Sequence, residues 1–247
     1  PPLAASAGLG AALVAPPLLC AASLVMLARI WRAPPERART LGLQPGKWLS
    51  PRELVLVVIA GSIWGLYNTA LIAAIAWTPG LLAARDITPV TAAAAASLIG
   101  WAAIVSITLG GWLSARSPWR DLPALGCFAL SAAALILLPS LGALAAAPWV
   151  MLGVGTVIGP AAAVIMTLPV EAARPQLRAL AMGIYLAVYY GMMGVAPALL
   201  GALRDRTGDA AAPLYAATAL LVACLVLWPA FRAIQRRAGA KTAGEAG

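Results

Sequence analysis

Histidine is absent from this 247-residue chain, and its 25 charged residues fall between long apolar runs or at their edges. Intramembrane Ser–His hydrolysis, a catalytic aspartate pair and a His-bound zinc each require residues that are missing at the depth where they would act. A retinal-type photoreceptor needs a lysine at mid-membrane depth, but Lys47 and Lys241 both lie in hydrophilic segments. The sequence therefore predicts no enzyme, no metal site and no cofactor.

Cysteine is also scarce. Cys20, Cys127 and Cys224 lie inside apolar runs, without the spacing of metal ligands. We expect them to be small packing residues and predict no disulfide.

Apolar residues make up 62% of the chain, in runs long enough to cross a bilayer, which takes about 20 helical residues. In lipid only helices or closed barrels satisfy their backbone, and these runs show no period-2 alternation. We expect an all-α integral membrane protein with seven transmembrane helices. The runs are Leu9–Ile30, Leu54–Ala83, Val90–Ala115, Leu122–Leu141, Pro148–Val170, Ala179–Leu203 and Pro213–Phe231.

The basic residues are unevenly distributed between the two ends of these runs. If the connections alternate sides, 14 of the 17 basic residues share one side, and the other side holds Arg85, Arg204 and Arg206. The positive-inside rule makes the first side cytoplasmic, so the chain starts outside and ends inside. The net charge of +9 thus indicates a multi-pass protein of the cell (inner) membrane and no nucleic-acid partner.

Seven of the nine tryptophans lie at or near run ends, where an indole at the membrane–water interface keeps its N–H hydrated. Trp101 lies in mid-run, and we expect it to pack in the core. The seven at run ends are Trp31, Trp48, Trp77, Trp112, Trp119, Trp149 and Trp228.

The start of the chain is unusual. It has no initial Met, and no basic segment precedes the first run, which makes that run a poor signal peptide. Together with the odd number of runs, this leads us to expect the carboxyl part of a longer protein.

Residues 111–120 (GWLSARSPWR) resemble the G-x-L-x-D-R-x-G-R loop on the cytoplasmic side of major facilitator superfamily transporters. Ala115 stands at the family's Asp and Pro118 at its second Gly, which weakens a latch role for the loop. The matching residues are Gly111, Leu113, Arg116 and Arg120.

Two later segments support the same resemblance. Residues 169–183 are similar to the family's P-x-E…R-x-x-A-x-G passage, through Pro169, Glu171, Arg178, Ala181 and Gly183. Residues 201–208 are similar to its G-x-L-x-D-x-T-G exit. Residues 64–69 (WGLYNT) resemble the cyanate-permease-like branch.

The resemblance implies helices six to twelve of a twelve-helix permease that carries a small-molecule solute by alternating access. Residues 1–30 would be the last helix of the N-terminal bundle, and 31–52 the cytoplasmic central loop. Residues 53–231 would be the C-terminal six-helix bundle, and 232–247 a cytoplasmic tail. Its partners would be the solute, the lipid bilayer and the missing N-terminal bundle of the same protein.

In such proteins each half is a pair of inverted three-helix repeats, so the second and fifth runs should be counterparts. Gly61 and Gly65 lie midway along one, and Gly155 and Gly159 midway along the other. Glycines four apart permit close helix approach, although chance spacing in a Gly-rich chain is the alternative. Pro160 and Pro197 predict kinks.

A solute site at lipid depth needs inward-facing polar or aromatic side chains. Trp64, Tyr67 and Asn68 follow helical spacing and share one face, and Tyr185 and Tyr189 lie four apart. We predict that these five line the cavity. Helix packing and an interhelical hydrogen bond are the alternatives.

At the cytoplasmic face, Arg116 and Arg120 would pair with Glu171 or Asp121, or serve as ordinary positive-inside anchors. Because no ionisable group lies at depth, ion coupling is expected elsewhere or not at all. The second functional hypothesis is a seven-helix membrane receptor or scaffold without transport activity.

Overall fold

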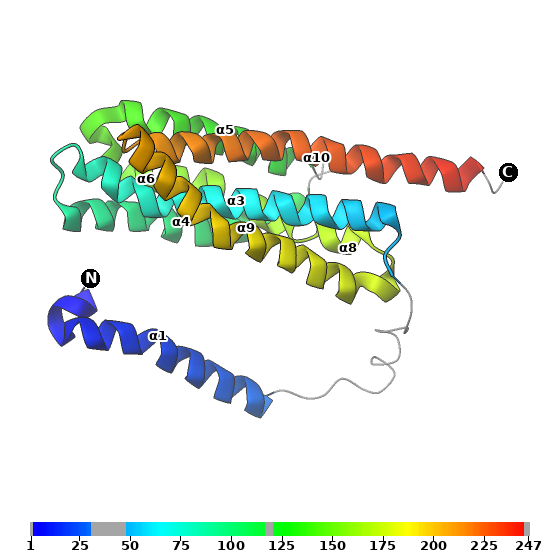
Figure 1. The fold of residues 1–247 in the computed structure, drawn as a ribbon, viewed down its shortest axis with the longest axis horizontal. Coiled ribbons are helices and arrows are strands. Elements are labelled where there is room, and N and C mark those ends of the chain that lie inside the picture. The colour runs from blue at the N-terminus through cyan, green and yellow to red at the C-terminus, as the bar shows by residue number, and fades with distance from the viewer. Residues whose placement is uncertain (1, 31–47, 117–120, 245–247) are drawn as a thin grey trace. The chain divides into compact units, whose positions relative to one another are not determined.

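A computed structural model describes residues 2–30, 48–116 and 121–244, and every regular element in these ranges is a helix (Figure 1). By its contacts the chain divides into two units, Pro1–Pro45 and Gly46–Gly247. The first unit contains α1 (Pro2–Ile30), whose residues from Pro17 onward are all exposed. Most of the expected central loop lies outside the described residues.

The second unit begins with α3 (Pro51–Ala83), α4 (Pro89–Arg116), α5 (Leu122–Leu137) and the 3₁₀ segment η1 (Leu138–Ala146). It continues with α6 (Pro148–Ile158), α7 (Ala161–Ile165), α8 (Leu168–Ala172), η2 (Pro175–Leu177), α9 (Arg178–Thr207) and α10 (Ala212–Gly244). The expected start of the tail at residue 232 therefore falls inside α10.

Within the described residues, six helical segments are long and apolar enough to span a membrane. They correspond to the second to seventh expected runs, which confirms an all-α, multi-pass membrane fold. The first expected run lies in α1, and its role as a seventh span stays a prediction. The six segments are Pro51–Ala83, Pro89–Arg116, Leu122–Gly142, Pro148–Ala172, Pro175–Thr207 and Ala212–Arg236.

Local sequence explains where the helices begin and end. At the start of α3, the Glu53 backbone N–H donates to the Ser50 Oγ, and the Ser50 backbone N–H donates to the Glu53 carboxylate. This capping box bonds the Glu53 amide of the first turn, and Pro51 at the first helical position has no amide that needs an acceptor. Gly208 ends α9 with a φ of 66°, a left-handed conformation that glycine adopts without strain.

The six spans form two sets of three. The first set consists of α3, α4 and α5, and the second consists of the segment from α6 to α8, then α9 and α10. The first helix of each set packs on the middle helix of the other, since α3 contacts α9 and α6 contacts α4. The two third helices, α5 and α10, also pack on each other. Helices far apart in the chain thus lie side by side (Figure 1).

Both predicted glycine pairs lie at these close contacts. A Cβ added at Gly61 would lie 2.8 Å from the Tyr185 carbonyl oxygen, and one at Gly65 would lie 2.7 Å from the Met192 Sδ. A Cβ at Gly155 would overlap the Ile99 carbonyl oxygen and one at Gly159 the Ser106 Oγ. Each pair therefore lets its helix touch the backbone of a helix from the other set.

The expected run 148–170 is not one continuous helix. It is broken first at Gly159–Pro160, between α6 and α7, because proline lacks the N–H that continues a helix. It is broken again at Met166–Thr167, where the Thr167 N–H bonds the Val164 carbonyl in a tighter turn. Pro197, by contrast, lies inside an uninterrupted α9.

Helix α9 differs from the other spans in burial. Only 6% of its most apolar window is buried, against 39% to 50% for the other five. Its contacts are mainly with α3, and the rest of its surface points away from the bundle.

The prediction that Trp101 packs in the core was wrong, because its side chain is 66% exposed on α4. The packed face of α4 carries Ile99, Ala102 and Ala103 instead. Successive residues on a helix are 100° apart, so Trp101 points away from that face.

The glycine contacts generate a test on one helix. We expect Gly155→Ala to lower the free energy of unfolding by about 1–3 kcal/mol, because its methyl group would force α6 away from α4. Gly153→Ala is the matched control, since a Cβ there meets nothing within 4 Å. Thermal unfolding of the full chain in detergent measures both, and an equal loss of stability would contradict the close-contact role of Gly155.

Candidate functional site

A row of aromatic rings crosses the bundle from α9 to α10. The Trp64 ring on α3 stacks on Tyr67, with centroids 5.6 Å apart, and lies 5.8 Å from Tyr189 on α9. Beyond Tyr67 the row continues through Phe128 on α5, at 6.3 Å, to Trp228 on α10, at 5.9 Å from Phe128. The row therefore connects four helices through ring contacts.

Tyr67 is buried, and its hydroxyl group has partners inside the protein. It donates to the carbonyl oxygens of Ile158, at 2.9 Å, and Gly159, at 3.3 Å. These two residues directly precede Pro160, where the helix is broken. Tyr67 therefore fits the alternative to a cavity-lining role, which is helix packing with an interhelical hydrogen bond.

Trp64, Asn68 and Tyr189 are half-buried and form the more open part of the row. The Asn68 Nδ2 donates to the Trp64 carbonyl oxygen at 3.0 Å. Among the described residues this is its one side-chain hydrogen bond, which leaves the amide oxygen for another donor. Two half-buried aromatic rings and an amide oxygen are what this surface offers a solute.

Tyr185 lies one turn before Tyr189 but is fully buried. Its hydroxyl lies 3.5 Å from the Met166 Sδ, a weak acceptor, near the second break of the α6–α8 segment. The five predicted cavity residues therefore divide into three on an accessible surface (Trp64, Asn68 and Tyr189) and two in the core (Tyr67 and Tyr185).

A second polar group, which we call the charged cluster, gathers at one end of the bundle around Arg232 of α10. Its guanidinium pairs with Asp121, before α5, at 2.7 Å and with Glu171 of α8 at 2.5 Å. Gln235 of α10 adds an acceptor for the same guanidinium at 2.8 Å. The Arg232 side chain is only 15% exposed, so these carboxylates balance a largely buried charge.

The charged cluster also includes Glu53 and Arg174. Arg174 donates to the Glu53 carboxylate from its backbone N–H at 3.0 Å and from two side-chain nitrogens at 3.0 and 3.1 Å. Arg52 donates to the carbonyl oxygens of Ile234 and Gln235. The ends of α3, α5, α8 and α10 are thereby fixed to one another.

Arg85 makes the corresponding connection at the other end of the bundle. It follows α3 and donates to the carbonyl oxygens of Gly142, at 2.9 Å, and Pro139, in the segment η1. The start of α6 is therefore held against the end of α3.

The loop-motif residues lie outside the charged cluster. Arg116 is exposed and stacks over Trp112, with its Cζ 4.1 Å from the ring centroid, while Asp121 and Glu171 take Arg232 as their partner. Gly111 lies close to α7, with Ala163 3.5 Å from an added Cβ. Leu113 and Arg178 are exposed, and Arg120 lies outside the described residues.

Sequence reasoning missed Arg232, Glu53 and Arg174. The signal for Glu53 was present, because Ser50 and Glu53 have the spacing of a capping box. Arg232 directly follows the last expected run and was assigned to the tail. The expectation of an interfacial Trp228 was also wrong: it is 1% exposed, and its indole N–H has no acceptor among the described residues.

The charged cluster generates a stability test. We expect Arg232→Ala to lower the free energy of unfolding by about 1–3 kcal/mol, because two partly buried carboxylates lose their partner. Arg236→Ala, one turn later on α10 at an exposed position, is the matched control. Chemical or thermal unfolding of the full chain in detergent measures the difference. Equal stability of the two variants would show that the ion pairs contribute nothing net.

No model of a known protein family, no curated protein and no solved structure matches this chain.

Proposed function

We propose that the second unit, Gly46–Gly247, is one half of a secondary transporter of the major facilitator type, which moves a small solute by alternating access. The observation that carries the proposal is the pairing of the two glycine motifs. Gly61 and Gly65 allow α3 to pack closely on α9, and Gly155 and Gly159 allow α6 to pack closely on α4. In both contacts the first helix of one set packs on the middle helix of the other set. An inverted repeat requires this exchange of equivalent contacts between its two sets.

The hydrogen bonds at both ends of the bundle support a half that moves as one body. Arg232 connects α10 to the start of α5 and to α8, and Glu53 connects α3 to the segment after α8. Arg85 ties the opposite end of α3 to the segment before α6. In alternating access such a unit rocks against a second bundle, and its internal contacts persist through the cycle.

In this proposal the surface of Trp64, Asn68 and Tyr189 faces the solute pathway. Ring faces and one amide suit a small organic solute or a weak anion better than a sugar, which demands more hydrogen-bonding groups. Coupling to an ion would use residues of the second bundle. The positive-inside distribution would place the charged cluster in the cytoplasm of an inner-membrane protein.

The rival function is a receptor or scaffold in which Asn68 is packed away from water. Accessibility to a charged thiol reagent distinguishes the two, because a thiol reacts as its thiolate and therefore needs a hydrated site. The test uses the full-length protein in the membranes of expressing cells. Its cysteine-free background carries Cys20→Ser, Cys127→Ala and Cys224→Ala, together with the replacement of any cysteine outside residues 1–247. Asn68→Cys is introduced into that background.

We expect Asn68→Cys to react with a membrane-impermeant methanethiosulfonate at least about tenfold faster than Leu66→Cys, because only the first faces water. Leu66 is the matched control, since it lies at nearly the same depth of α3 on an apolar groove. Rates are measured on right-side-out and inverted vesicles. Protection of Asn68→Cys from both sides would exclude the transporter and favour the receptor or scaffold.

A further inference from the structure

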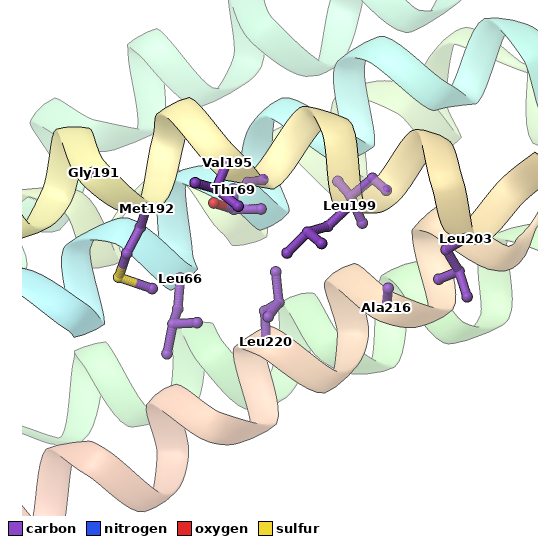
Figure 2. A pocket seen from close by; sticks show the side chains of 11 residues that line it. Leu66, Thr69, Gly191, Met192, Val195, Leu199, Leu203, Ala216 and Leu220 are labelled. Carbon is purple, nitrogen blue, oxygen red and sulfur yellow. The ribbon is translucent and has the colours of Figure 1, made fainter.

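A groove of the second unit runs between α9 and α10, and side chains of α3 also line it. The two helices are joined by the short turn at residues 208–211 and make few contacts beyond it. The space between them has a volume of about 640 Å³ (Figure 2). Its lining residues are Leu66, Thr69, Gly191, Met192, Val195, Ala196, Leu199, Leu200, Leu203, Ala216 and Leu220.

The groove offers almost nothing to a polar ligand. Thr69 carries the one polar side chain among its described lining residues, and that hydroxyl lies against the Met193 Sδ at 3.5 Å. Val195 and Leu199 at the rim are 55% and 64% exposed. The chemistry of the groove therefore fits a hydrocarbon chain.

The length of the groove matches one leaflet of a bilayer. Its lining residues on α9 follow one side of the helix from Gly191 to Leu203, a rise of about 18 Å. One leaflet contributes about 15 Å of hydrocarbon, half of the bilayer core. Gly191 is near the middle of α9 and Leu203 near its end, so the groove spans the leaflet on the side of the α9–α10 turn.

Charged side chains lie at the end of the groove where a lipid headgroup would be, and the two arginines there, Arg204 and Arg206, are accompanied by two exposed aspartates, Asp205 and Asp209. Arg204 and Arg206 directly follow Leu203 and are exposed. The Arg204 guanidinium lies 5.6 Å from the Trp77 ring centroid, an arrangement common at the headgroup boundary. Arginine pairs well with phosphate, so this end complements the phosphodiester of a phospholipid.

We propose that the α9–α10 groove binds one phospholipid from the bilayer, with an acyl chain along Gly191–Leu203 and the phosphate at Arg204 and Arg206. The occupant follows from the apolar lining, the one-leaflet length and the two arginines at its end. This site is separate from the surface of Trp64, Asn68 and Tyr189, so the proposal does not depend on transport.

Native mass spectrometry of the full chain in mild detergent, titrated with palmitoyl-oleoyl phosphatidylglycerol, tests the proposal. We expect one lipid adduct on the wild type and an affinity about tenfold weaker for Ala216→Trp, whose indole fills the groove. Ala219→Trp, one turn later on α10 at an exposed position outside the groove, should bind like the wild type. Arg204→Gln with Arg206→Gln should also weaken binding.

Gly191→Phe gives a second variant that fills the groove from α9, for use if Ala216→Trp does not fold. A side chain there meets nothing within 4 Å at its Cβ, so the backbone tolerates it. Unchanged lipid binding in the groove-filling variants, or no adduct on the wild type, overturns the proposal. A dimer that the same variants abolish overturns it too, because the groove is then an interface between two copies of the chain.

Discussion

The second unit depends on two places where helices approach to backbone contact. Inside a bilayer the hydrophobic effect does not drive helices together, because lipid tails are as apolar as the side chains, so close packing has to hold them. Gly61 and Gly65 provide that packing for α3 on α9, and Gly155 and Gly159 provide it for α6 on α4. With these contacts fixed, α5 and α10 are positioned against each other, and the bundle has one arrangement.

The break at Pro160 and the aromatic row are consequences of the same arrangement. A broken helix exposes carbonyl groups that lipid cannot satisfy, and an unsatisfied polar group is costly there. The Tyr67 hydroxyl reaches the Ile158 and Gly159 carbonyls only because α3 lies beside α6 and α7. The tyrosine therefore gives the Ile158 carbonyl a donor at the break, while its neighbour Trp64 is only half-buried.

The sequence predicted the spans well, because charged residues and proline bound each apolar run. It could not predict which side of a span faces inward, since α4 is apolar all round and its pattern does not separate Trp101 from Ile99. Tyr185 and Tyr189 are one turn apart with different burial, which depends on where α9 crosses α3. Arg232 was missed because the extra turns of α10 beyond Phe231 are stabilised by its tertiary partners Asp121 and Glu171, which have no local signal.

The low burial of α9 has a practical consequence for handling the protein outside its native bilayer. A helix that buries so little of its surface in its own bundle depends on its close contact with α3 at Gly61 and Gly65, and elements with few buried residues open at the lowest free-energy cost. Short-chain detergents, which replace lipid with a thin and mobile micelle, would loosen α9 while α3, α4 and α6 stay packed. A preparation can then remain helical and monodisperse and yet have lost Tyr189 from its place beside Trp64, so helical content alone is a poor measure of its integrity.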